Sequence, residues 1–292
     1  MSRDNLQLPR LERQPMEPRA LKSIVLSTIT VICAVTACIP LFSVLIMLIF
    51  RGGKRLTLEL FYTLPPGAFD APGAGGFGNA IVGTAFMVGI AGLISIPFGI
   101  LAAVSLAELD PHSKISEIAR FCAKTMTGLP SIIAGVFAYA IVVLVMGHYS
   151  AWAGGVALSL LMIPTVMLTA EEAIKMVPNP MREAAYGMGC TPAQSLLKVI
   201  LPVAMPGIIT GVVLAVARAA GETAPLLFTA LFSESWLSPN GPTASLAVLI
   251  YNWSSSPYEN LIELAWAASL ILVVLVFVLN IVSRSMGGKT KL

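Results

Sequence analysis

The sequence has 292 residues, of which 57% are hydrophobic and only 11% are charged, and its formal net charge is +3. A soluble domain carries about 25% charged residues, so this composition excludes a water-soluble enzyme and requires lipid to solvate much of the surface. The four cysteines contain no CxxC pair, so they imply neither a disulfide framework nor a metal site.

Residues 1–21 are polar and rich in arginine, and the apolar run that follows them is too long for the core of a signal peptide. We therefore predict a cytoplasmic tail and an uncleaved first helix. Six apolar runs have roughly the 20 residues that cross a bilayer; in chain order they are 22–50, 78–107, 126–147, 151–175, 203–232 and 261–283. These runs predict an all-α polytopic membrane protein, with six transmembrane helices over residues 22–284 and a short tail over 285–292.

The distribution of Lys and Arg predicts which side of the membrane each loop faces. Six spans place both tails on one side, and most of the 18 Lys and Arg residues fall on that side. The other side has Arg51, Lys54 and Arg55, while the segment 232–260 has no Lys or Arg. Because cytoplasmic loops carry the excess of positive charge, we predict that both termini are cytoplasmic. The cluster at Arg51 is the exception to the rule.

Three patterns resemble catalytic or nucleotide-binding motifs but lack their context. Residues 73–78 match GxGxxG in letters, yet they follow Asp and Pro rather than a strand, and the GKT at 288–290 lacks the first glycine of a phosphate-binding loop. His112 and His148 lie at loop ends, so they supply no base at membrane depth. We predict no catalytic residue, no metal site and no cofactor in this chain.

A polar segment between the fourth and fifth runs has a long, fixed spacing. It reads Glu-Ala-Ala, three residues, Gly, nine residues, then Val-x-Leu-Pro, and its marked positions are Glu183, Ala184, Ala185, Gly189, Val199, Leu201 and Pro202. A short helix around Glu183 can end at Gly189 in a left-handed turn, and Thr191 followed by Pro192 can begin a second helix. We predict that residues 178–202 form a rigid knob of two short helices; an ordinary amphipathic surface loop is the alternative.

The fifth run holds an Arg and a Glu four residues apart. From a rise of about 1.5 Å per residue, Arg218 lies near mid-bilayer, where an arginine costs roughly 2.5 to 3.5 kcal/mol unless it faces protein or water. The pair shares one helix face with Gly211 and Ala215, which predicts that it points into a bundle or a translocation path, with Glu222 one turn above. Pro225 lacks an N–H, so we expect a kink or break beside the pair. A purely structural ion pair is the alternative.

Two further sets of polar residues are weaker candidates. Thr127 and Ser131 can begin a helix whose free N–H groups bind an anion, although a plain N-cap and a packing contact are the expected roles. Glu171 and Glu172 close the fourth run. We expect both carboxylates to be solvated, with Lys175 available at the four-residue spacing.

The 178–202 segment is similar to the EAA loop of ABC importer permeases, with Val at the usual Ile position. Three other segments resemble the A-type permeases of phosphate ABC importers, the PstA type: ARAAGETAPLLFT at 217–229, GFGNAIVGT at 76–84 and LPSII at 129–133. Together these matches cover most of residues 75–284 but not the tail before residue 22. The resemblance implies the type I ABC importer permease fold in a bacterial plasma (inner) membrane.

The same resemblance implies a transport subunit without a catalytic centre. Its partners would be a C-type phosphate permease in a heterodimer, two ATPase subunits that bind ATP and Mg²⁺, an extracytoplasmic phosphate-binding protein and the lipid bilayer, but no nucleic acid. The EAA loop would dock in a groove of the ATPase. Arg218 would offer phosphate a planar fork of donors, and Glu222 would act as a gate. A sulfate or molybdate permease and an ion-coupled secondary transporter are the alternatives.

Overall fold

The computed structural model describes residues 18–67 and 73–287, and every regular element in these ranges is a helix. Five helices are long and apolar enough to cross a membrane, and a sixth span is obtained if one pair of bent helices counts as one. The all-α prediction is therefore confirmed for the described residues. Residues 1–17 and 288–292, which include most of the two predicted tails and the GKT run, lie outside the described residues.

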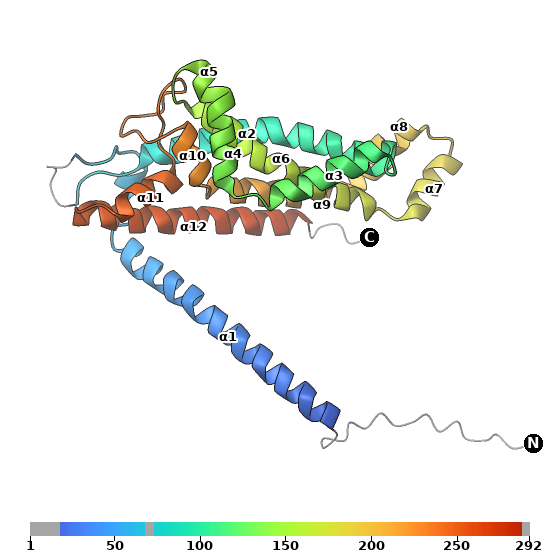
Figure 1. The fold of residues 1–292 in the computed structure, drawn as a ribbon, viewed down its shortest axis with the longest axis horizontal. Coiled ribbons are helices and arrows are strands. Elements are labelled where there is room, and N and C mark those ends of the chain that lie inside the picture. The colour runs from blue at the N-terminus through green and yellow to red at the C-terminus, as the bar shows by residue number, and fades with distance from the viewer. Residues whose placement is uncertain (1–17, 68–72, 288–292) are drawn as a thin grey trace, which may run out of the picture. The chain divides into compact units, whose positions relative to one another are not determined.

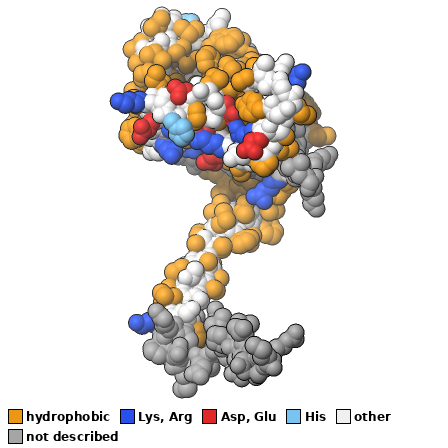
Figure 2. All heavy atoms as spheres, turned by 90° about the vertical axis from the view of Figure 1, so that its right-hand side faces the viewer, with side chains coloured by type: hydrophobic (Ala, Val, Ile, Leu, Met, Phe, Trp, Pro, Cys, Tyr) orange, Lys and Arg blue, Asp and Glu red, His pale blue; other side chains and the backbone are white. Residues whose placement is uncertain are grey.

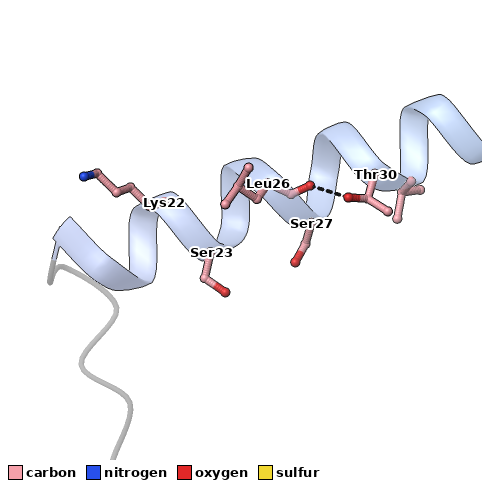
Figure 3. A pocket seen from close by; sticks show the side chains of 6 residues that line it. Lys22, Ser23, Leu26, Ser27 and Thr30 are labelled. Atoms are coloured by element: carbon pink, nitrogen blue, oxygen red, sulfur yellow. Dashed lines mark hydrogen bonds between the residues drawn. The ribbon is translucent and has the colours of Figure 1, made fainter.

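By its internal contacts the chain divides into two units, Met1–Phe50 and Arg51–Leu292, which are described separately. Helix α1 (Pro18–Gly53) supplies the first unit. The Thr30 hydroxyl donates to the carbonyl of Leu26 at 2.8 Å, as Figure 3 shows. The shallow hollow drawn there is lined by side chains of this helix alone. A hydroxyl that is satisfied within its own helix suits a segment that crosses the apolar interior of a membrane.

Four long helices form the frame of the second unit, and they lie side by side in Figure 1: α2 (Gly78–Val104), α6 (Ala151–Lys175), α9 (Leu201–Ala220) and α12 (Glu259–Gly287). Small residues set their spacing. A Cβ added to Gly99 of α2 would lie 2.7 Å from Cγ1 of Val166 in α6, and one added to Gly211 of α9 would collide with the hydroxyl of Thr169 in α6. Close approach at small residues is typical of helices that pack within lipid.

The third apolar run is bent rather than straight. It consists of α3 (Lys114–Thr127), α4 (Ser131–Ala138), the π-helical segment Tyr139–Val143 and α5 (Leu144–Met146). The two halves of this run meet at 105°. The predicted run 126–147 is therefore not one straight helix: it crosses the bend, because Pro130 and the residue before it are disfavoured in helical backbone, and its second helix begins at Ser131.

The bend also changes the roles of two candidate residues. Thr127 is the last residue of α3, and its hydroxyl donates to the carbonyl of Lys124 at 2.7 Å, so the predicted N-cap role is wrong. Ser131 is the first residue of α4, whose N-cap position is occupied by Pro130. The two hydroxyl residues therefore lie on different helices, on either side of the bend.

The fifth run begins and ends earlier than the predicted 203–232. Helix α8 (Pro192–Ser195), the π-helical segment Leu196–Ile200 and α9 form one continuous helix from Pro192 to Ala220. Residues 221–223 are not helical, and α10 (Ala224–Thr229) follows. Hydropathy alone could not locate either end, because the start is polar while the sequence after the break remains apolar.

An additional helix, α11 (Leu246–Ser254), lies in the segment 232–260, where the sequence predicted only an exported loop. Ser245 caps this helix, because its hydroxyl accepts a hydrogen bond from the N–H of Val248 at 3.3 Å. Trp253 is buried in the core cluster that α11 forms with α12. The helix has 9 residues, which is too few for a span, so the search for apolar runs did not find it.

Charged side chains gather at one end of the second unit. Figure 2 looks onto the end that carries α7 (Asn179–Gly187) and α8, and it shows Lys, Arg, Asp and Glu close together there. The sequence assigned this end to the cytoplasm.

The exceptional arginines after the first run are bound to the start of α12. Arg55 donates from Nη2 to Oδ1 of Asn260 at 2.7 Å, and its Nε lies 3.7 Å from Oε2 of Glu263. The guanidinium of Arg51 lies 5.4 Å from the centroid of the Trp266 ring. A carboxylate partner and an aromatic face offset these two positive charges, which explains why they sit on the side that the charge rule assigns to few cations.

Candidate coupling and translocation sites

The first helix of the predicted knob ends in a left-handed turn. Gly189 has a φ of +82°. Two backbone bonds close the turn: Gly189 N donates to the carbonyl of Tyr186 at 2.9 Å, and Cys190 N donates to that of Ala185 at 3.1 Å. This is the Schellman pattern, which leaves a glycine in the left-handed position just after a helix. The structure thus confirms the predicted left-handed end, although α7 extends over a longer range than the sequence indicated.

The second helix of the knob begins with a capping box. Thr191 Oγ1 accepts from the N–H of Gln194 at 3.3 Å, and Oε1 of Gln194 accepts from the N–H of Thr191 at 3.0 Å. Pro192 occupies the first turn. The predicted N-cap is confirmed. This helix continues through the π-helical segment Leu196–Ile200 and through Leu201 and Pro202 into α9, so no loop separates the knob from α9.

The Glu-Ala-Ala triplet divides between the surface and the core. Glu183 and Ala184 are exposed, whereas Ala185 is buried. Tyr186 and Met188 beside the turn are also exposed. Apolar side chains that stand together with a carboxylate at the surface suit contact with another protein.

Arg182 fastens the knob, although the sequence indicated only a cytoplasmic charge there. Its Nη1 forms an ion pair with Glu108, which lies in the π-helical segment Ser105–Leu109 at the end of α2. Its Nη2 donates to the carbonyl of Ile174 at 2.8 Å, and its Nε donates to that of Val177 at 3.4 Å. Spacing within a helix could not reveal partners that belong to other helices.

Glu171 is buried, so the prediction that it is solvated is wrong; Glu172 is exposed, as predicted. One oxygen of Glu171, Oε1, accepts from Nζ of Lys175 at 2.5 Å and from Nε of Arg120 at 2.6 Å. The sequence spacing revealed Lys175. The spacing could not reveal Arg120, because that residue lies in α3, 51 residues before Glu171, and meets it only in the folded chain.

The Arg218 and Glu222 side chains do pair, with 3.7 Å between Nε and Oε1. Arg218 lies in the last turn of α9, but Glu222 lies beyond the helix end, so it does not sit one helical turn above as predicted. The Arg218 side chain is 58% exposed and that of Glu222 is 17% exposed. Among the residues that the structure describes, Glu222 is the one side-chain partner of this guanidinium, so its other donors are available.

The predicted common face of α9 changes its surroundings along the helix. Gly211 and Ala215 are buried against neighbouring helices, whereas Arg218 is exposed. At about 100° per residue the three residues lie within a sector of roughly 60°, so Arg218 shares their face but lies in the last turn of α9, beyond the packed part. The exposed Arg218 side chain is therefore not covered by the rest of this chain.

The break after Ala220 is held by close packing rather than left loose. Pro225 is buried in the first turn of α10, and a Cβ added to Gly135 of α4 would lie 2.6 Å from Pro225 Cα. Thr229 Oγ1 donates to the carbonyl of Pro225 at 2.8 Å, and the N–H of Ser150 donates to the carbonyl of Thr229 at 3.1 Å. The interruption occurs close to Pro225, at residues 221–223.

A bundle of helices long and apolar enough to cross a membrane, with a capped knob at its charged end and an arginine beside a helix break, is the architecture of a polytopic membrane protein. Solved structures share this fold. The chain is similar to a subunit of a bacterial alginate ABC transporter, with a TM-score of 0.64 and 15% identity over 94% of this chain and 98% of that one. The chain is also similar to a chain of the MetNI methionine ABC transporter in an inward-facing conformation. The TM-score is 0.58 and the sequence identity is 21%, over 71% of this chain and 93% of that one. The fold is that of type I ABC importer permeases.

Sequence comparisons identify the family. A model of the family described as "Binding-protein-dependent transport system inner membrane component" matches residues 95–290. The phosphate transport system permease protein PstA of Pasteurella multocida is 40% identical over 91% of this chain and 94% of its own length. PstA of Haemophilus influenzae is 40% identical over 82% of this chain and 85% of its own length. A probable PstA of Methanocaldococcus jannaschii is 35% identical over 82% of this chain and 84% of its own length. The chain belongs to the PstA family of binding-protein-dependent transport system permeases.

Proposed function

We propose that this chain is the A-type permease subunit of an ATP-driven importer of inorganic phosphate. It would form a heterodimer with a C-type permease, so that each chain supplies half of the translocation pathway. The names of the PstA relatives support phosphate as the substrate. The observation that carries the proposal is the exposed Arg218 at the end of α9, because an arginine at membrane depth must face protein or water.

The geometry of the pair suits an anion that passes without lodging. The free guanidinium donors of Arg218 form a planar fork that matches phosphate oxygens. Glu222, 3.7 Å away, lowers the local positive charge and repels an anion that stays. Conduction requires a site that attracts the ion but binds it weakly enough to release it. We therefore assign Arg218 to the pathway and Glu222 to gating.

The knob is the element through which ATP hydrolysis would act. Exposed Glu183 and Ala184 would contact the ATPase, and Ala185 and Gly189 would hold the docking shape. Leu201 and Pro202 continue the knob into α9, which ends at Arg218. Two ATPase subunits would bind ATP and Mg²⁺, and an extracytoplasmic binding protein would deliver phosphate. The chain itself would contribute binding surfaces and a pathway but no catalytic centre.

The orientation follows from the same assignments. The knob end of the bundle would face the cytoplasm, where the ATPase would lie, and the six predicted spans would put both termini on that side. Residues 1–21 and 285–292 would then be cytoplasmic tails of a bacterial inner membrane protein. The gathering of charge at the knob end supports this orientation.

Uptake of labelled phosphate by the reconstituted complex tests the proposal. We expect Arg218→Gln to reduce uptake because the donor fork is lost, and Glu222→Gln to change uptake because the anion is retained. Arg284→Gln, which removes an exposed cation from the last turn of α12, is the control and should transport normally. Full transport by both pathway variants would refute the assignment of the pair.

Two further arms separate the alternatives. Excess sulfate or molybdate should leave phosphate uptake unchanged; competition by either anion supports a permease for another oxyanion. The purified chain alone should show no uptake driven by an ion gradient. Gradient-driven uptake without the ATPase would identify a secondary transporter.

A further inference from the structure

We propose that Arg182 and Glu108 clamp the coupling knob to the cytoplasmic end of α2, so that α7, the end of α2 and the end of α6 move as one body. This inference rests on the proposed docking of the ATPase on the knob. It concerns how force leaves the knob, and it assigns both residues a positioning role.

The peptide link between α6 and α7 is short, and backbone hydrogen bonds from Met176 N to the carbonyl of Glu172 at 3.0 Å and from Val177 N to that of Ile174 at 3.2 Å tie its first two residues to α6. Residues 176–178 separate Lys175, the last residue of α6, from α7. Pro178 precedes α7 in an extended conformation, with a ψ of 137°. Pro178 has no N–H to continue these bonds, so α7 would pivot at Pro178 if no side chain held it.

The Arg182 side chain reaches back across that link. Its Nη2 and Nε donate to the carbonyls of Ile174 and Val177, which lie on the α6 side and within the link. The carbonyl of Ile174 also accepts from Val177 N at 3.2 Å, so the arginine binds its second lone pair, and a cation is favoured at this negative end of the helix dipole. The guanidinium thereby holds α7 at a fixed angle to α6.

The remaining nitrogen of the fork reaches a third element. Arg182 Nη1 pairs with Glu108, and the two side chains are only 19% and 14% exposed. Charge-assisted bonds are stronger than neutral ones, and partial burial protects them from screening by salt. The fork therefore joins three elements through one planar group, which a lysine could not do.

A second arginine braces the same place from another helix. Arg120 of α3 pairs with Glu171 of α6, and its Nη2 and Nη1 donate to the carbonyls of Leu106 at 2.6 Å and Pro111 at 2.9 Å. Arg120 and Arg182 thus both bind the segment Ser105–Leu109 at the end of α2, from two different helices. The end of α2 is π-helical at Ser105–Leu109, so its backbone is already off the regular α register where both arginines bind.

The clamp predicts a separation between docking and coupling. Glu183 and Ala184 are exposed and Arg182 is mostly covered, so loss of the fork leaves the docking surface in place. The ATPase would still bind and hydrolyse ATP, but α7 would pivot on the link instead of moving α2 and α6. Less phosphate would then be moved for each ATP hydrolysed.

The test compares variants in the reconstituted complex, with ATPase association, ATP hydrolysis and phosphate uptake measured on the same preparation. We expect Arg182→Gln to retain ATPase association and to lower phosphate moved per ATP several-fold. Arg182→Lys keeps a charge for Glu108 but loses the planar fork, so it should be intermediate, as should Glu108→Gln. Arg284→Gln is the control with an unchanged ratio. An unchanged ratio in Arg182→Gln and Glu108→Gln overturns the inference.

A cross-link tests the clamp without relying on loss of function. Cysteines replace Arg182 and Glu108 in a chain whose four native cysteines have been changed to serine, and a short bifunctional thiol reagent joins them. Before cross-linking, the double variant should move less phosphate per ATP than the unmodified chain. Cross-linking should restore the phosphate moved per ATP. A cross-link that blocks uptake, or that leaves the ratio low, means that the two elements must move apart and overturns the inference.

The two proposals fail in different ways. If the unmodified chain does not retain the ATPase, the docking function and the clamp both fall. If the unmodified chain retains the ATPase and transports phosphate, but substitutions at Arg182 and Glu108 leave the phosphate moved per ATP unchanged, only the clamp is refuted.

Discussion

Gly189 allows backbone strain in the knob to be changed without changing any side-chain contact. Its φ is +82°, and a Cβ added there meets nothing within 4 Å. Gly189→Ala therefore introduces no clash. The substitution adds only the conformational energy that a residue with a Cβ has in the left-handed backbone region, which is about 1–2 kcal/mol. The turn bonds donated by Gly189 N and Cys190 N must hold the native shape against that cost.

If the knob docks the ATPase, this strain should weaken docking by a calculable amount. A cost of about 1–2 kcal/mol lowers the population of the native turn relative to its competitors by a factor of up to roughly 5–30. The Kd of the purified ATPase for the permease heterodimer in detergent should rise by no more than that factor. Gly189→Asn should lose less, because asparagine tolerates the left-handed region better than alanine.

Gly187 provides a matched control two residues earlier. A Cβ at Gly187 also meets nothing within 4 Å, but this residue lies in α7, and its φ is not in the left-handed region. Gly187→Ala should keep or improve ATPase affinity, because alanine is favoured over glycine in a helix by about 1 kcal/mol. Equal losses for the two alanine variants, or no loss for Gly189→Ala, would refute the link between this turn and docking.

Three other predictions concern the packing around the two sites. Gly135→Ala should overpack the contact with Pro225, so thermal unfolding should show the complex destabilised by about 1–3 kcal/mol and phosphate uptake should fall. Normal stability would show that α10 can move aside. Glu171→Gln should destabilise by about 1–3 kcal/mol because it leaves two cations without a carboxylate, whereas Glu172→Gln should stay within about 0.5 kcal/mol. Thr191→Ala removes the capping box and should lower ATPase affinity with a cost of about 1 kcal/mol, which Thr191→Ser should largely restore.

The long helices could be predicted from the sequence because lipid imposes one length and one polarity on every span. The fourth run was predicted at 151–175, and α6 has those bounds. The knob was predictable for a different reason. Its left-handed glycine and its capping threonine act within a few residues of each other, so local chemistry determines the turn at Gly189 and the start at Pro192.

Features that depend on distant parts of the chain could not be predicted in this way. The bend before Ser131 has a proline signal, but hydropathy continues across it and concealed the change of direction. The burial of Glu171 depends on Arg120, which follows the second span and crosses to the end of α6. The same holds for Arg182, whose partner Glu108 comes before α3. Ion pairs between helices require the tertiary arrangement, which spacing along one helix does not contain.

The interruption after α9 bears on the pathway that we propose. Irregular backbone at membrane depth is tolerated only where protein buries it or a water-filled cavity receives it. On one side of the break at residues 221–223, Pro225 and Thr229 are buried, with Gly135 of α4 against Pro225. Arg218, in the last turn of α9 before the break, is exposed. Under the proposed function this exposed arginine would meet the second permease chain or the phosphate path, so the pathway would run beside the break where this chain leaves its own backbone packed and its arginine uncovered.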